Sequence, residues 1–237
     1  MEYQHICEAR FLRRPNRFVA DVLIDGREER VHVKNTGRCG ELLVPNAKVY
    51  LQDFSTCMGN RKMRYSLIAV EKQREEDCLL VNMDAQAPNQ VVKEALTEGR
   101  LRLPNMGKLV HIRPEAVYGA SRLDFYLQDE DGREAFMEVK GVTLEHDGLA
   151  SFPDAPTLRG IKHLRELSEL AQKGVGAYAL FVLQMEKMTS FAPNEQRHPA
   201  FAQALREAAD AGVCVLAYDC LVTANTLELW KPVPVSL

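Results

Sequence analysis

The sequence predicts a two-domain α/β protein of the α+β kind, with a small β-barrel over residues 1–81 and a mixed sheet flanked by helices over residues 82–237. Three observations support this prediction: strand-like alternation through the first third, a change to helical periodicity near Ala85–Asn89, and the element order α-β-β-β-α-β-α-β after it. The 237 residues are 46% hydrophobic and 27% charged, which excludes a disordered or fibrous protein.

The first domain reads as a barrel of the OB type. Alternation in Arg17–Ile24 and Glu29–Val33, joined by the turn at Asp25-Gly26, predicts a hairpin. Further strands are expected at Lys48–Gln52 and Tyr65–Lys72. About five short strands without a convincing helix between them fit a small closed barrel.

The second domain begins with a helix over residues 89–98, for which Asn89 is the expected cap and Gly99 the expected end. The elements expected after it are strands near 114–118, 121–128 and 133–140, helix 157–173, strand 176–185, helix 198–211 and strand 213–219. The helix over 157–173 is the clearest, because its leucines form one apolar stripe and Gly174 follows it.

Charge, hydropathy and cysteine spacing exclude several classes of protein. The net charge is -3, but residues 1–81 carry 14 Lys and Arg against 12 Asp and Glu, so the first domain is the better candidate for an anionic partner. No run approaches the roughly 18 apolar residues of a membrane helix, and the start lacks a signal-like apolar core, so we expect a cytoplasmic protein without a membrane partner. The six cysteines form no C-x-x-C pair, which disfavours a zinc ribbon or a disulfide scaffold.

Two carboxylates and a lysine are expected to converge on neighbouring strands. Glu138 and Lys140 share one strand face, and a hairpin at Asp131-Gly132 brings the strand that carries Asp124 alongside. Carboxylate oxygens suit Mg²⁺ or Mn²⁺, which can activate a water, while Lys140 can neutralise the developing anion. The alternative is structural: an Asp124–Lys140 or Glu138–Arg122 ion pair on a solvated sheet face.

Basic residues gather at three places that suit contact with nucleic acid. Arg13, Arg14 and Arg17 lie among two phenylalanines, Arg61 belongs to a second basic cluster, and Arg159, Lys162 and His163 begin the long helix. Solubilising arginines and a solvated helix face remain open alternatives. The loop with Asn35-Thr36-Gly37 has turn chemistry and is equally a candidate for ligand contact.

These residues resemble the sugar fermentation stimulation protein A (SfsA) family nearly end to end. The matching segments are Arg17–Val22, Asn35–Gly37, Tyr118–Ala120, Ser121–Phe125, Met137–Lys140, Val142–Leu144, Phe152–Ala155, Arg159-Gly160 and Lys162–Leu167. The chain departs from the family at Gly141, where serine is common, and at Cys39, where methionine is usual.

The resemblance implies an N-terminal OB-like domain and a C-terminal domain of the PD-(D/E)xK nuclease, or restriction-endonuclease-like, fold. It implies DNA binding without strong sequence preference and a link to regulation of sugar utilisation. By the same resemblance Asp124 and Glu138 are metal-binding acids, Lys140 is the catalytic lysine and Glu115 is an auxiliary metal ligand.

Our first interpretation is therefore a DNA-binding protein with a Mg²⁺- or Mn²⁺-dependent phosphodiesterase site at Asp124, Glu138 and Lys140. Its closest rival is a non-enzymatic DNA-binding regulator with the same fold. A sugar-sensing protein is the third interpretation, for which the sequence offers little. Whether the chain forms a homodimer is left open.

Overall fold

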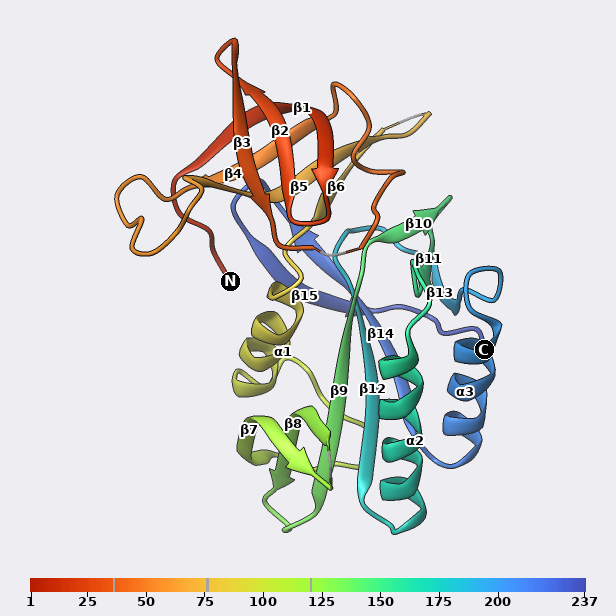
Figure 1. The fold of residues 1–237 in the computed structure, drawn as a ribbon. Coiled ribbons are helices and arrows are strands. Elements are labelled where there is room, and N and C mark those ends of the chain that lie inside the picture. The colour runs from red at the N-terminus through yellow and green to blue at the C-terminus, as the bar shows by residue number, and fades with distance from the viewer. Residues whose placement is uncertain (36, 76, 120) are drawn as a thin grey trace.

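The computed structural model describes residues 1–35, 37–75, 77–119 and 121–237. A β-barrel formed by the first third of the chain sits above one end of a twisted sheet with three helices (Figure 1). Thr36 and Ala120, which belong to two of the family-like segments, lie outside the described residues.

The N-terminal domain is a closed five-stranded barrel. Its strands are β1 (Ile6–Asn16), β2 (Val19–Ile24), β3 (Arg27–Val33), β4 (Lys48–Asp53) and β5 (Tyr65–Gln73). Pairing runs β3-β2-β1-β4-β5, and a parallel β3–β5 pairing closes the ring. Strand β6 (Cys78–Asn82) adds to β5 outside the ring. The predicted OB-like barrel is confirmed, and closure removes the open edges that a flat sheet would expose.

The C-terminal domain is built on a six-stranded mixed sheet in the order β15-β14-β12-β9-β8-β7. Its strands are β7 (Leu109–Tyr118), β8 (Ser121–Asp129), β9 (Glu134–Val142), β12 (Gly176–Leu183), β14 (Cys214–Val222) and β15 (Leu227–Pro232). Strands β9, β12 and β14 run parallel in the centre, and the outer strands are antiparallel. This arrangement confirms the mixed sheet flanked by helices that the sequence predicts.

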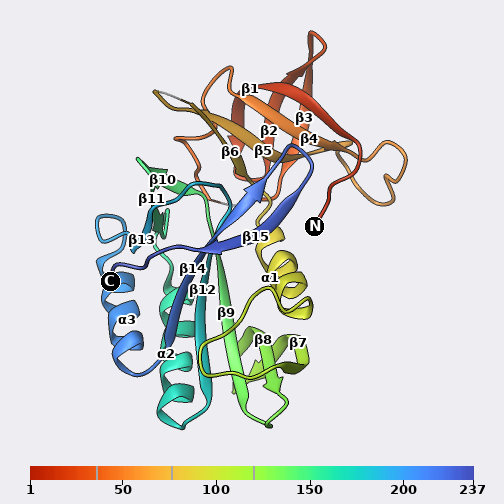
Figure 2. The ribbon, with the colours of Figure 1, turned by 180° about the vertical axis from the view of Figure 1, so that it is seen from behind.

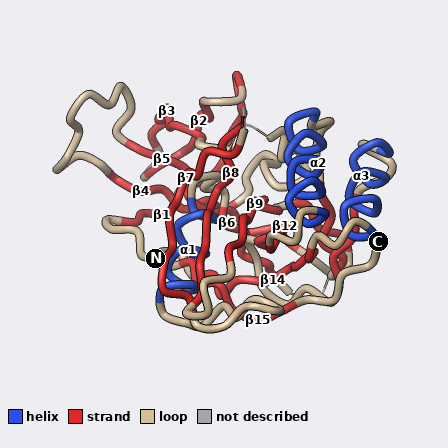
Figure 3. Tube along the Cα trace, turned by 90° about the horizontal axis from the view of Figure 1, so that it is seen from below, coloured by secondary structure: helices blue, strands red, loops and turns tan. Residues whose placement is uncertain are grey.

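Helices cover both faces of this sheet (Figure 3). Helix α1 (Ala87–Thr97) packs against the face that presents Tyr178, Leu180 and Val182 of β12. Helices α2 (Leu158–Gln172) and α3 (Pro199–Asp210) pack on the opposite face, where the alternate residues Ala179 and Phe181 point. The period of two along the strand therefore separates two hydrophobic cores.

The helix boundaries follow from their end residues. The Thr157 side chain caps α2 by accepting a hydrogen bond from the Gly160 amide at 3.0 Å, as a threonine at the N-cap position does. Helix α1 starts earlier than the sequence predicts, because Pro88 occupies its first turn and Gln86 its N-cap position. The prediction that Asn89 caps this helix is wrong: Asn89 lies inside the helix, and its side chain is directed elsewhere.

A small three-stranded sheet, absent from the sequence prediction, lies between the barrel and the helices. It consists of β10 (Leu144–His146), β11 (Leu149–Phe152) and β13 (Ser190–Pro193), with β11 paired parallel to β13. Strands of three or four residues give too little alternation to be recognised from sequence. Strand β15, the edge strand that pairs with β14, was also missed; Figure 2 shows both strands in blue.

Polar contacts join the barrel to the second domain. Buried Glu145 of β10 accepts hydrogen bonds from Lys72 and from Arg74 at 3.0 Å, both near the end of β5. Lys34, after β3, pairs at 2.6 Å with buried Asp84, just before α1. Within the described residues, no helix is long and apolar enough to cross a membrane.

Candidate active site

The ladder between β8 and β9 stops at Asp124. Main-chain pairing runs from Gln128 and Glu134 as far as Phe125 and Met137. Two residues further along β9, the amide of Val139 donates instead to Asp124 Oδ2 at 2.8 Å. Because a side chain takes the place of the neighbouring main chain here, the two strands diverge beyond this point.

Asp124 is held from two sides in a largely buried position. Asn89, on α1, donates from Nδ2 to Asp124 Oδ1 at 2.8 Å. Burial, followed by the negative charge of Glu138, raises the pKa of Asp124 above its usual range. Glu138, across the β8–β9 hairpin, is thus close enough for its charge to act on Asp124, and a joint role of the two acids in binding metal stays a prediction.

Glu138 is 5% exposed and shares one oxygen between two donors. Lys140 Nζ donates to its Oε1, and His163 Nδ1, from α2, contacts the same atom. Burial, the largest single effect, favours the protonated acid, but the hydrogen bond with His163 and the charge of Lys140 outweigh it and lower the pKa of Glu138. The carboxylate is thus held ionised inside the protein.

The second oxygen of Glu138 is unsatisfied. Oε2 is buried and has no hydrogen-bond partner among the residues described. A buried charged acceptor without a partner is costly, so this position calls for a donor or a cation. Mg²⁺ and Mn²⁺ bind through one or two carboxylates and keep several waters, so Asp124 and Glu138 fit such an ion.

No fully formed metal cage accompanies the two carboxylates. Residues 1–35, 37–75, 77–119 and 121–237 contain no group of three or more His, Cys, Asp and Glu side chains placed to hold a metal. A magnesium site that is completed by water and by substrate phosphate does not need a third side chain.

The strand faces agree with the predicted alternation. Met137 and Val139 belong to the α1-side core, while Glu138 meets His163 of α2 on the opposite face. Neither Asp124–Lys140 nor Glu138–Arg122, the two ion pairs of the structural alternative, is present in the described part of the chain. Lys140 instead pairs with Glu138 itself.

Glu115 lies on β7, next to the strand that carries Asp124. It has a positive φ of 53°, and its side chain pairs with Arg122 at 3.0 Å with 73% of its surface exposed. Among the residues that the structure describes, Arg122 is the partner of the Glu115 side chain, and neither Asp124 nor Glu138 is. The role of Glu115 as an auxiliary metal ligand stays a prediction.

The three basic residues of α2 have different surroundings. His163 lies four residues before Leu167, so it shares the sheet-facing side of the helix and is 3% exposed. Lys162 remains exposed and lies 3.7 Å from Glu166, the i,i+4 pair expected for a solvated face. Arg159 lies one turn before His163, with Nε 3.4 Å from His163 Nε2. The buried His163 contacts Glu138, whereas the exposed Arg159 and Lys162 remain candidates for contact with phosphate.

The four barrel arginines all have partners within the barrel, and these partners differ in kind. Arg14 donates to the carbonyl oxygens of Arg17, Asn35, Gly37 and Arg38. Arg13 pairs with Asp21 at 2.8 Å and with Glu28. Arg17 and Arg61 lie over the rings of Phe18 and Phe54, at 4.8 Å and 3.7 Å from the ring centres. Arg14 therefore fixes a loop, and the other three remain candidates for contact with DNA.

Asn89 is the site residue that the sequence analysis missed. Its hydrogen bond to Asp124 joins α1 to β8 across 35 positions of sequence, which no local pattern reveals. The one available signal was Pro88. A proline favours the first turn of a helix, so Asn89, which follows it, falls inside the helix and is not needed as its cap.

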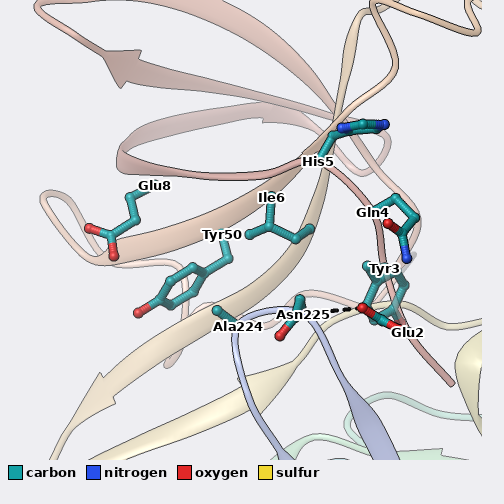
Figure 4. Close-up of a pocket in the computed structure, with 9 residues that line it drawn as sticks. All are labelled: Glu2, Tyr3, Gln4, His5, Ile6, Glu8, Tyr50, Ala224 and Asn225. Carbon is teal, nitrogen blue, oxygen red and sulfur yellow. Dashed lines mark hydrogen bonds between the residues drawn. The ribbon is translucent and has the colours of Figure 1, made fainter.

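A separate pocket lies elsewhere, between the N-terminal segment, the barrel and the turn after β14 (Figure 4). Its volume is about 380 Å³, and Glu2, Glu8, Tyr50 and Asn225 are among its lining residues. None of the predicted site residues lines it. Two carboxylates at its wall disfavour a phosphate ligand, so we do not assign the catalytic chemistry to it.

The fold and the candidate site together define a class of two-domain proteins. In this class an OB barrel is joined to a mixed sheet, and a buried acid, a second acid and a lysine lie where two strands of the sheet separate. Comparison with known proteins identifies the class. Residues 12–81 match the family model of the SfsA N-terminal OB domain, and residues 86–226 match that of the sugar fermentation stimulation protein RE domain. The chain belongs to the sugar fermentation stimulation protein (SfsA) family.

Similar proteins cover the whole chain. Sugar fermentation stimulation protein homologs from Desulfitobacterium hafniense strain DCB-2 and from Clostridium beijerinckii are 48% and 45% identical over 237 residues, with 99% and 100% of those proteins covered. The solved structure of Pyrococcus furiosus SfsA in complex with Ca²⁺ aligns with a TM-score of 0.86 at 29% identity, covering 100% of this chain and 98% of that one.

Proposed function

We propose that this protein is a divalent-metal-dependent phosphodiesterase that acts on DNA without strong sequence preference. The observation that carries the proposal is the buried, unpartnered Oε2 of Glu138, on the strand next to Asp124. A buried acid and a half-buried acid that repel each other gain from a cation between them, and a protein that only binds DNA gains nothing from acids that repel phosphate.

Asp124 and Glu138 would hold Mg²⁺ or Mn²⁺, and Glu115 is a further candidate ligand. Such an ion supplies an activated water and stabilises charge on the attacked phosphate. Lys140, already fixed beside Glu138, would neutralise charge that develops on the phosphate oxygens. His163 orients Glu138, and Asn89 orients Asp124.

The contacts with DNA fall on two surfaces. Arg159 and Lys162 at the start of α2 lie on the helix that carries His163, where phosphate would be close to the two acids. On the barrel, Arg13, Arg17 and Arg61 would contact the phosphate backbone. His163 is buried and would act on the substrate only indirectly, through its contact with Glu138.

Two findings on relatives support this proposal. The Pyrococcus furiosus relative was solved with Ca²⁺, a cation that takes the same oxygen ligands as Mg²⁺ and Mn²⁺. The relatives carry the name sugar fermentation stimulation protein, and we include a role in sugar utilisation in the proposal.

A cleavage assay tests the enzymatic part. The purified chain is incubated with single-stranded DNA, duplex DNA and RNA, with and without Mg²⁺ or Mn²⁺. Lys140→Ala should lower the rate by about 100-fold or more and keep metal binding, whereas Glu138→Ala should lose both. Lys231→Ala, at an exposed lysine of the edge strand β15, is the matched control for loss of a lysine and should cleave DNA at a rate within a few-fold of the parent.

The second candidate is a DNA-binding regulator without enzymatic activity. The direct Lys140–Glu138 ion pair favours it, because that pair compensates Glu138 without any metal ion. This candidate predicts that Lys140→Ala lowers the melting temperature and that the parent protein cleaves no nucleic acid with any metal. Such a result would leave DNA binding as the function.

A further inference from the structure

Three residues on neighbouring strands, Arg113, Tyr126 and Phe136, form one row of side chains, the aromatic row. Phe136 of β9 is paired with Tyr126 of β8, which is paired in turn with Arg113 of β7. Residues directly opposite each other in an antiparallel pair lie on the same face of the sheet, so the three side chains are neighbours. The rings of Tyr126 and Phe136 meet edge to face with centres 5.3 Å apart, and the Arg113 guanidinium lies 4.9 Å from the centre of the Tyr126 ring.

The aromatic row lies next to the candidate active site. Because side chains alternate along a strand, Phe136 and Glu138 lie on the same face of β9, about 7 Å apart along the strand. Their contacts agree with this placement, since Phe136 packs against the core that α2 covers and Glu138 meets His163 of α2. On the neighbouring strand, Tyr126 lies two residues from Asp124. A nucleic-acid strand that has one phosphate at the two acids and follows β9 would therefore bring its neighbouring nucleotide to the aromatic row.

The side chains of the row are partly accessible to solvent. In the described chain, α2 packs mainly against β9 and β12, and α3 packs against α2 and β13. Strands β7 and β8 lie on the other side of β9 from β12, at the edge of the sheet (Figure 1). Arg113 is exposed, and Tyr126 and Phe136 are half-buried. The contact of Phe136 with the core fixes the row, while its outer part stays within reach of a ligand.

The groups around the row are basic on β7 and acidic only at the end far from the site. His111 is exposed, and its ring packs edge-on against that of Tyr126 with centres 6.0 Å apart. The Tyr126 hydroxyl donates to Glu134, which lies on β9 at the opposite end of the row from Glu138. This hydrogen bond orients the ring through its hydroxyl group. The row thus combines oriented rings with the charge of Arg113.

This combination suits unpaired nucleobases. Bases of a single strand stack on aromatic rings and on arginine guanidinium groups, whereas the bases of a duplex are stacked inside the double helix. Stacking tolerates every base, because each has a π-face, so it agrees with binding without strong sequence preference. The exposed Arg113 supplies positive charge for the phosphate that follows a stacked base.

We infer that the aromatic row stacks unpaired bases next to the candidate active site and that single-stranded DNA is the preferred substrate. The inference rests on the proposed function for the phosphate that is cleaved, but not for binding of the strand. The structural alternative is an aromatic cluster that only stabilises the edge of the sheet. It predicts that loss of a ring lowers the melting temperature and leaves DNA binding unchanged.

Fluorescence anisotropy in metal-free buffer tests binding separately from cleavage. The probes are a labelled DNA strand of about 16 nucleotides, the duplex of the same sequence, and a strand of the same length with abasic sites throughout. The abasic strand keeps the phosphates and lacks the bases. The complete strand should bind about tenfold more tightly than the abasic strand, the effect of one stacked base, and also more tightly than the duplex.

Variants of the two rings assign this preference to the row. Tyr126→Leu and Phe136→Leu keep an apolar side chain without a ring, and each should weaken binding of the complete strand about tenfold and leave the abasic strand and the duplex within about twofold. Tyr126→Trp should retain the preference, because it keeps an aromatic face. Tyr218→Leu, at a half-buried tyrosine of β14 packed against the core on the α1 side, is the matched control and should bind like the parent. A melting curve for each variant verifies that it is folded.

Equal binding of the complete and abasic strands, tighter binding of the duplex, or unchanged binding by folded Tyr126→Leu and Phe136→Leu would each overturn the inference. A protein whose ring variants lose the preference for the complete strand, but which cleaves no nucleic acid with any metal, would refute the proposed phosphodiesterase and keep the aromatic row. A protein that cleaves single-stranded and duplex DNA equally fast, with the same rates in Tyr126→Leu, would refute only the role of the row.

Discussion

Asp124 has a structural role, and the proposed function gives the same carboxylate a chemical role as well. One oxygen receives the Val139 amide that a main-chain carbonyl would otherwise receive, and the other receives Asn89. Burial and the nearby Glu138 raise its pKa, so ionised Asp124 costs stability unless a cation is bound. A metal ion bound here, as we propose, would therefore stabilise the fold through this residue.

Asp124→Asn should show this cost directly. A carboxyl group whose pKa is raised on folding stabilises the protein when protonated, and that contribution is lost as pH rises from about 4 through the raised value. In metal-free buffer the melting temperature of Asp124→Asn relative to the parent should thus increase from pH 4 to pH 7.

Added Mn²⁺ should reverse the order. The parent should gain about 2.7 kcal/mol of unfolding free energy at 100 times the dissociation constant, and Asp124→Asn should gain little. The lowered pKa of Glu138 has the opposite sign, with stability lost as pH falls, but it is common to both proteins. An equal response of both proteins to Mn²⁺ would contradict a metal site at Asp124.

At the scale of secondary structure, the sequence predicts the elements that are long enough to show a clear periodicity within one continuous segment of chain. The hairpin that places Asp124 beside Glu138 follows from alternation and one turn, and α2 follows from its leucine stripe. The strands β10, β11 and β13 could not be predicted, because each has only three or four residues and exists through pairing with distant chain. The same limit explains why Asn89 and the burial of His163 were missed, since both depend on contacts between elements.

Packing of α2 against α3 depends on Gly160. A Cβ there would lie 2.9 Å from Thr157 Cγ2 and 3.1 Å from the Phe201 ring. In an open helix position Gly→Ala stabilises by about 1 kcal/mol, but here the added methyl group has no space. Gly160→Ala should instead lower the unfolding free energy by about 1–3 kcal/mol in urea titration. A stabilised variant would show that the two helices can move apart at no cost.

At the scale of the whole molecule, two kinds of ion pair connect the domains. Glu145 is 3% exposed and joins Lys72 and Arg74, whereas Lys187 and Asp77 form an exposed pair at 3.2 Å. Burial decides how much the loss of one partner costs, because a buried charge left alone is uncompensated whereas solvent screens an exposed one.

Glu145→Ala should therefore destabilise the protein by about 2 kcal/mol or more, because two partly buried cations lose their partner. Asp77→Ala breaks the exposed pair and should cost less than about 1 kcal/mol. Urea unfolding of both variants measures the difference. Equal effects would mean that the ion pairs of Glu145 are not what joins the domains.

The distribution of basic residues on the barrel makes a prediction about salt. Replacing Arg13, Arg17 and Arg61 with alanine should weaken binding to all DNA sequences alike and reduce the salt slope by about 0.9 for each lost phosphate contact. Arg14 is excluded from the set because its loss would release the loop that holds Asn35 and Gly37. Binding isotherms at several salt concentrations measure the slope, and an unchanged slope would place the DNA contacts on the second domain.

The close approach of Gly37 to Asp154 also constrains how this protein can evolve. A Cβ at position 37 would be 2.3 Å from Asp154 Oδ2, so a side chain there requires the carboxylate of Asp154, far along the sequence and in the other domain, to move or to be lost. A single substitution at position 37 should then be deleterious, and a larger residue there should be tolerated only together with a smaller one at 154. The barrel and the second domain are for this reason expected to be inherited as a pair, because a barrel exchanged from a distant relative would bring its loop against a residue selected for a different neighbour.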